Sequence, residues 1–207
     1  KLSLSAFKVK YQSWCKKEEY RYSEPKAEKI HKYARTLVST IPSTESIKMV
    51  ISEAAKALNS TLEALGKLHS EMDALSAQLP EYETVMDMYG VGKILGSQLI
   101  AEIGDIRKLH SGKALVAMAG IDPPPHQSGT VDTRSRSISK RGSPALRKTL
   151  FQVIGVYLQR QPKDEPVYQF LEKKRTEGKP YKVYMIAAAH KFLRIYYARI
   201  KEVMPTQ

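Results

Sequence analysis

Six basic residues and no acid fall between positions 134 and 148, and this segment is the first candidate for chemistry. The six are Arg134, Arg136, Lys140, Arg141, Arg147 and Lys148. Ser143 followed by Pro144 is a typical N-cap and first-turn pair, so a helix with free backbone N–H groups should begin beside these cations. Cations next to a helix N-terminus bind phosphate. The segment therefore predicts a polyanion-binding site, and the alternative is a solvated basic loop.

A second candidate is the turn formed by Gly90, Gly92 and Lys93, which precedes an apolar helical stretch. The glycines allow a tight turn that leaves the N–H groups of the next helix open to a phosphate, beside the charge of Lys93. This pattern is typical of a helix-hairpin-helix motif, whose contacts hold the nucleic-acid backbone without reading sequence. The alternative is a plain turn between two helices.

A serine close to the basic segment could act as a nucleophile. Ser128 follows three prolines and precedes Gly129, which permits a turn that leaves the serine projecting. A serine can attack a phosphodiester when arginines stabilise the charge that develops on the phosphoryl oxygens. Residue chemistry alone does not single out Ser128, because four more serines are near: Ser135, Ser137, Ser139 and Ser143.

Carboxylates and histidines give no sign of a metal site within the chain. A two-magnesium centre needs several carboxylates gathered at one place, and the candidates Glu102, Asp105, Asp122 and Asp132 have no matching spacing. His190 lies on an apolar helical stretch and is interpreted as a core residue. We expect this chain to hold no metal.

The overall charge supports a polyanionic partner. Lysine and arginine number 34 against 21 acids, which gives a net charge of +13. Nucleic acid is the preferred partner, because the bases cluster in loops rather than on one amphipathic helix face suited to a membrane surface. No apolar run approaches the ~20 residues of a spanning helix, residues 1–10 lack a secretory signal, and Cys15 is the lone cysteine. These features predict a cytoplasmic protein without a membrane partner.

Apolar residues recur every three or four positions from residue 47 to 79, which predicts a long helix with a heptad stripe. Ser43 or Thr44 can cap it and Pro80 ends it. Such a stripe favours coiled-coil pairing between copies over packing on the chain's own domain. The members are Ile47, Ile51, Ala54, Leu58, Thr61, Leu65, Leu68, Met72, Leu75 and Leu79.

The remaining patterns complete a mainly α fold with three parts: a basic helical segment at 1–43, a coiled-coil arm at 44–80 and a compact helical domain at 81–207. The first part mixes lysines with aromatics that could stack on single-stranded RNA, although such rings more often build a small core. Residues 121–139 read as a long loop, which is often functional. Helices are expected at 85–88, 95–106, 114–119, 144–157, 166–177 and 181–203.

Four blocks, in order and spacing, resemble the C-terminal domain of the IS-one-ten family of insertion-sequence transposases, the bridge-RNA-guided recombinases. The blocks are Tyr89-Gly90-Val91-Gly92 through Ile106, Ala114 to Pro123, Gln127-Ser128-Gly129, and Ile138 to Ser143 with Leu146-Arg147. The resemblance implies a serine that attacks DNA, which aligns with Ser128; Ser137, Ser139 and Ser143 remain alternatives. It also implies donor and target DNA, a guide RNA, and oligomers assembled through the coiled coil.

Family members also carry an N-terminal RuvC-like domain with four carboxylates for magnesium. That domain is absent from these 207 residues, which open with Lys1 rather than methionine. We therefore expect a transposase part that is inactive alone, from a prokaryotic, nucleoid-associated protein. The alternative function is a non-catalytic module for nucleic-acid binding and oligomerisation.

Overall fold

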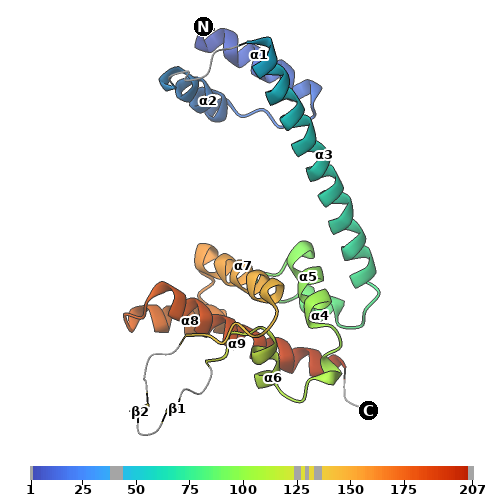
Figure 1. Cartoon of the computed structure of the whole chain (residues 1–207), viewed down its shortest axis with the longest axis vertical. Helices are drawn as coiled ribbons and strands as arrows, with labels where there is room; N and C mark the ends of the chain where they lie inside the picture. The colour runs from blue at the N-terminus through green and yellow to red at the C-terminus, as the bar shows by residue number, and fades with distance from the viewer. Residues whose placement is uncertain (1, 38–43, 124–126, 129–130, 133–136, 205–207) are drawn as a thin grey trace. The chain divides into compact units, whose positions relative to one another are not determined.

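The computed structural model is mainly α-helical, as the sequence predicts, and it forms two compact units (Figure 1). It describes residues 2–37, 44–123, 127–128, 131–132 and 137–204, without the side chains of residues 127, 128, 131 and 132. The units are Lys1–Ser60 and Thr61–Gln207. The three-part division at 1–43, 44–80 and 81–207 stays a prediction.

The first unit contains helices α1 (Leu4–Lys17) and α2 (Glu24–Thr36), which pack against each other. Lys8 joins them, because its Nζ atom lies 2.7 Å from a carboxylate oxygen of Glu24 and 2.6 Å from one of Glu28. Cys15 and Ala27 are fully buried. Small residues and one ion-pair network therefore hold this helix pair.

The aromatic residues of the first unit form a series of stacked rings that runs from half-buried to exposed positions. Ring centroids lie 5.9 Å apart for Phe7 and Tyr11, 6.0 Å for Tyr11 and Trp14, and 5.3 Å for Trp14 and Tyr20. Trp14 is 49% exposed and Tyr20 is 62% exposed. The expectation of a small core therefore fails for Trp14 and Tyr20, whereas Phe7 and Tyr11 are half-buried.

Helix α3 (Glu45–Ser76) is the long helix that the heptad stripe predicts. Its first turn is capped by Thr44, whose Oγ1 atom accepts a hydrogen bond from the N–H of Ile47 at 3.3 Å. The helix ends before Pro80, because the residue preceding a proline avoids helical backbone. Its 32 residues span ~48 Å. Much of the apolar stripe is exposed, including Ile51, Leu58, Leu65, Leu68 and Leu75.

The second unit is a helical bundle with one short hairpin. Strands β1 and β2 pair antiparallel with Ser128 opposite Val131. The helices lie close to the predicted ranges. The elements are α4 (Tyr82–Met86), α5 (Lys93–Ile103), the 3-10 helix η1 (Ile106–Lys108), α6 (Gly112–Met118), β1 (Gln127–Ser128), β2 (Val131–Asp132), α7 (Pro144–Arg160), α8 (Pro166–Thr176) and α9 (Tyr181–Val203).

Helix α9 organises the core of this unit, since it packs against α4, α6, α7 and α8 (Figure 1). Phe192, Leu193 and Tyr196 on α9 are buried, and each large buried side chain contributes ~1.5–3 kcal/mol. Burial also raises the pKa of the Tyr196 hydroxyl. The rest of the bundle is positioned against this helix.

Asp73 near the end of α3 ties together the start of α4 and the start of α5. Its carboxylate accepts hydrogen bonds from the hydroxyls of Tyr82 at 2.7 Å and Ser97 at 3.3 Å. The Lys93 ammonium lies 3.5 Å from its second oxygen. The hydrogen bond from Tyr82 and the nearby Lys93 charge lower the pKa of the Asp73 carboxyl.

We predict that Tyr82→Phe raises the pKa of Asp73, because it removes the main hydrogen bond to the carboxylate. A carboxyl whose pKa is lowered by folding stabilises the protein above its unfolded pKa, and this stability is lost as the pH falls through the folded pKa. The variant should therefore begin to lose stability at a higher pH than wild type. Carbon NMR titration of the Asp73 carboxyl and acid unfolding measure both effects.

The matched control is Tyr33→Phe, since Tyr33 is exposed and lies in the other unit. It should leave the titration of Asp73 unchanged. An unaltered Asp73 pKa in Tyr82→Phe would show that the hydroxyl does not stabilise the carboxylate.

Candidate functional site

The chain crosses itself where residues 118–122, at the end of α6, meet residues 139–143, just before α7. Three backbone hydrogen bonds join the two segments. The N–H of Ser139 donates to Asp122 O at 2.8 Å, that of Lys140 to Gly120 O at 2.9 Å, and that of Ser143 to Met118 O at 2.7 Å. We call this contact the backbone crossing. It closes the loop 123–138 at its base.

Two glycines make the backbone crossing possible. Gly120 has a φ of +63°, a conformation that other residues rarely adopt. A Cβ atom on Gly120 would lie 2.5 Å from the backbone nitrogen of Gly142. A Cβ atom on Gly142 would overlap the backbone of Met118 and Gly120. Both positions therefore require the absence of a side chain.

Three polar side chains from the basic segment secure the same crossing. Ser139 donates its hydroxyl hydrogen to Asp122 Oδ1 at 2.7 Å, and Ser143 donates to Glu102 Oε2 at 2.8 Å. Ser143 also caps α7, as predicted, by accepting the N–H of Leu146. The Arg147 guanidinium donates to the carbonyl oxygen of Ala119 at 2.9 Å. These three side chains stabilise the fold, because their polar atoms form hydrogen bonds within the protein.

Ser128 lies on β1, in the hairpin that the loop carries. Its neighbours along the chain include Arg134 and Arg136, both of which lie outside the described residues. Among the alternative nucleophiles with a described side chain, Ser137 is exposed. The structure therefore separates Ser139 and Ser143, which are bound to acids, from Ser128 and Ser137, while Ser135 lies outside the described residues.

The exposed cations of the segment are Lys140, Arg141 and Lys148. Within the described part of the chain, none of the three forms an ion pair with an acid. Lys140 has a φ of +56°, an uncommon left-handed conformation at the point where the chain turns into the backbone crossing. These side chains form a positive surface at the start of α7.

The Gly90 turn is packed against α7. Gly90 has a φ of +78°, and a Cβ atom there would lie 3.3 Å from the Tyr157 ring. Gly92 is the N-cap of α5, so the first N–H groups of that helix have no capping side chain. Lys93 extends from the same turn with its side chain 79% exposed. The turn could hold an anion, although Asp73 already lies close to Lys93.

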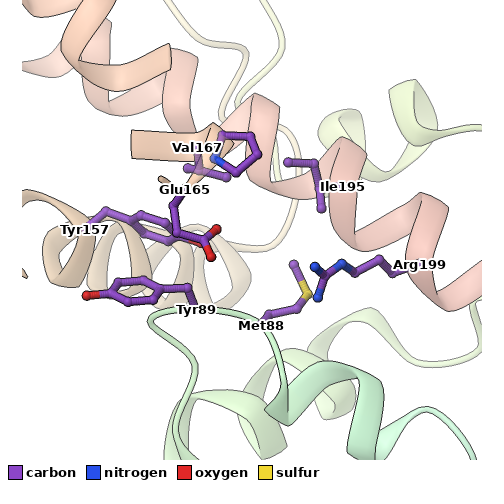
Figure 2. A pocket seen from close by; sticks show the side chains of 8 residues that line it. Met88, Tyr89, Tyr157, Glu165, Val167, Ile195 and Arg199 are labelled. Carbon is purple, nitrogen blue, oxygen red and sulfur yellow. The ribbon is translucent and has the colours of Figure 1, made fainter. Parts of the chain in front are cut away.

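A small cavity of about 40 Å³ lies behind this turn, among α7, α8 and α9 (Figure 2). The rings of Tyr89 and Tyr157 meet at its edge in a tilted contact, with centroids 5.1 Å apart and planes at 52°. Glu165 and Arg199 also line it. Burial raises the pKa of the Tyr157 hydroxyl. The cavity has room for about one water molecule. It is therefore too small to be a substrate site and lies where three helices pack together. Nothing in the local sequence pattern indicates it.

The described residues contain no group of three or more histidines, cysteines, aspartates and glutamates that could hold a metal. His190 is half-buried, and its Nε2 atom lies 2.9 Å from the carbonyl oxygen of Ile121. Because a carbonyl can only accept, Nε2 carries the hydrogen. In the part of the chain that the structure covers, no helix is long and apolar enough to cross a membrane.

We predict that Gly142→Ala destabilises the second unit by about 2–3 kcal/mol, because its methyl group overlaps backbone atoms that cannot move independently. Gly155→Ala is the matched control. Gly155 lies inside α7 with no atom near its missing Cβ, so alanine should stabilise by about 0.5–1 kcal/mol. Denaturant unfolding followed by circular dichroism measures both; equal stability of Gly142→Ala and wild type would contradict the steric argument.

Comparison with known proteins finds a transposase family that is similar to part of the second unit. Residues 82–169 match the protein family described as Transposase IS116/IS110/IS902 family. A pilin gene-inverting protein of Moraxella bovis is 34% identical over 117 residues, which are 56% of this chain and 35% of that protein. The transposase for insertion sequence element IS1111A of Coxiella burnetii is 33% identical over 88 residues, or 42% of this chain and 24% of that protein.

A longer match runs to the insertion element IS900 uncharacterized 42 kDa protein of Mycobacterium paratuberculosis. It is 23% identical over 199 residues, which are 96% of this chain and 49% of that protein. The chain thus spans about a quarter to a half of the curated relatives it matches. The family match covers the Gly90 turn, Ser128 and the backbone crossing, so the residues of the candidate site are similar to those of the IS116/IS110/IS902 transposase family.

Proposed function

We propose that this chain is the DNA-handling part of a transposase that cuts and rejoins DNA with Ser128 as its nucleophile. Two relatives are named for such activities, one a transposase and the other a gene-inverting protein, and both names describe rearrangement of DNA. Guidance by RNA and a separate RuvC-like domain that holds magnesium belong to the same proposal. They rest on the sequence resemblance alone.

Ser128 is preferred because the hydroxyls of two competing serines already donate hydrogen bonds within the protein. Ser139 donates to Asp122 within the backbone crossing, and Ser143 donates to Glu102 on α5, so a nucleophilic role of either serine would break a hydrogen bond that holds the fold. Ser137 is exposed but lies outside the Gln-Ser-Gly block of the resemblance. Ser128 sits on a hairpin whose loop is closed by the backbone crossing, an arrangement that presents a loop residue from a rigid base.

The proposed step exchanges one phosphodiester for another. The Oγ atom of Ser128 attacks the phosphorus, and the bond from phosphorus to one deoxyribose oxygen breaks. The hydroxyl proton passes to a base, for which carboxylates of the RuvC-like domain are the candidates, and the leaving oxygen gains a proton. Because the serine ester keeps the phosphoryl group, the hydroxyl of another strand can reverse the reaction without a nucleotide cofactor.

The positive surface at the start of α7 would hold the DNA backbone. Lys140, Arg141 and Lys148 are exposed cations, and Arg134 and Arg136 precede them along the chain. Gly90, Gly92 and Lys93 would contribute a further backbone contact at the start of α5. Arg147 would support this surface rather than contact DNA directly, because its guanidinium donates a hydrogen bond to the carbonyl oxygen of Ala119.

The first unit and α3 would serve RNA binding and assembly. Residues 1–43 carry ten bases and four acids, and the exposed ring stack at Trp14 and Tyr20 suits unpaired bases. The exposed stripe of α3 would pair with a second copy, because ~48 Å of helix with an apolar seam is not stable alone in water.

We predict that Ser128→Ala abolishes a covalent protein–DNA adduct while leaving DNA affinity within about twofold of wild type. The experiment uses the full-length protein, its guide RNA and labelled DNA, and detects adducts that resist denaturation. Ser137→Ala is the matched control and should form the adduct normally. Omitting the RNA should also prevent the adduct in wild type.

An adduct that persists in Ser128→Ala would assign the nucleophile to another serine. If wild type gives none under conditions in which the same substrate recombines, the alternative function of a non-catalytic binding and oligomerisation module is correct.

We further predict that the double variant Leu58→Asp, Leu65→Asp dissociates the full-length oligomer, because it places charge on the apolar stripe of α3. Ser60→Asp adds a charge at an exposed position off the stripe and should leave the oligomer intact. Sedimentation velocity measures the mass of each. An unchanged mass in the double variant would show that α3 does not join the copies.

A further inference from the structure

A large groove lies in the second unit, between the start of α7, the start of α9 and the segment 137–140. Its volume is about 870 Å³, within the range of about 300–1,000 Å³ for sites that hold small organic groups. The lining is mainly apolar and includes Ile138, Phe151, Val183 and Ile186. We call it the α7–α9 groove.

An exposed aromatic ring stands at the edge of the α7–α9 groove. Tyr181 is 54% exposed, and its ring meets that of Tyr184 edge to face, with centroids 5.4 Å apart and planes at 82°. This geometry is favourable for aromatic pairs and limits the freedom of the Tyr181 ring. Phe151 provides a second aromatic surface in the groove lining. The groove therefore offers preorganised aromatic faces rather than flexible aliphatic ones alone.

Cations surround this apolar lining. Lys140, Lys148 and Lys182 line the groove and are exposed, and none of them pairs with an acid among the residues that the structure describes. Arg147 also lines the groove, but its guanidinium is held by Ala119. The acid next to the groove, Asp122, accepts the hydroxyl of Ser139. The net charge around the groove is therefore positive.

We propose that the α7–α9 groove binds an unpaired nucleotide of a DNA strand, with its base against Phe151 and Tyr181 and its flanking phosphates on the three lysines. Bases stack on aromatic side chains whatever their sequence. Paired DNA presents phosphates and base edges but hides the faces of its bases, so it cannot use the apolar lining. A base turned out of the helix uses both features.

A short stretch of chain connects the groove to the hairpin of the proposed nucleophile. Pro123 lines the groove and precedes Ser128 by five residues, so their α-carbons are separated by at most about 18 Å, the length of an extended chain. A nucleotide held in the groove would be close along the DNA to the phosphate that is attacked. The proposal rests on DNA being the substrate, and it does not depend on which serine is the nucleophile.

The test measures binding of the full-length protein to a DNA duplex with one unpaired 2-aminopurine and to the same duplex fully paired. In wild type, stacking should quench the 2-aminopurine fluorescence. Tyr181→Ala should weaken binding of the bulged DNA about tenfold and remove the quenching, while paired DNA binds within twofold of wild type. Tyr181→Phe keeps the ring and should behave as wild type, which separates loss of stacking from loss of the fold.

A matched pair of lysine variants tests the phosphate contacts. Lys182→Ala should reduce the salt dependence of bulged-DNA binding by about one ion. Lys179→Ala removes the same charge three residues earlier, at an exposed position that does not line the groove, and should not change that dependence.

Equal losses for bulged and paired DNA in Tyr181→Ala would overturn the proposal, because the groove would then contact only the backbone. A labelled glutamate–tyrosine copolymer whose binding depends on Tyr181 while neither DNA does would also overturn it and identify a peptide site. If wild type binds neither DNA, the proposed function fails as well, and this outcome is distinct from the other two.

Discussion

The backbone crossing between residues 118–122 and 139–143 is the constraint on which the candidate site depends. Its three hydrogen bonds exist only because Gly120 and Gly142 carry no side chain. The crossing fixes the end of α6 against the start of α7 and closes the loop that carries Ser128. A loop held at its base can present one residue reproducibly.

The basic segment serves two purposes that its composition does not separate. Arg147, Ser139 and Ser143 are bonded to groups of the protein itself. Lys140, Arg141 and Lys148 face solvent. Because a group engaged with the protein contributes little to a ligand, the surface available to a polyanion is smaller than six clustered bases suggest. Lys182 on α9, a distant part of the chain, adds another exposed cation to this surface.

Local patterns were sufficient for the secondary structure. The three- and four-residue spacing of apolar residues predicted α3 and the bundle helices, and Ser143 with Pro144 predicted the start of α7, because periodicity and capping are properties of neighbouring residues. Local patterns do not decide which aromatic residues of α1 are exposed. Burial depends on tertiary packing: Cys15 is buried, whereas the adjacent Trp14 is 49% exposed.

The sequence by itself determined the mainly α fold, the positive charge and the four blocks that resemble the transposase family. Only the tertiary structure decided which serines and basic residues of the segment are hydrogen-bonded within the protein and which are exposed. The bonds of Ser139, Arg147 and Ser143 reach partners 17, 28 and 41 residues away. The α7–α9 groove likewise joins segments that are distant along the chain. Such contacts arise from tertiary packing, which leaves no signature in the spacing of neighbouring residues.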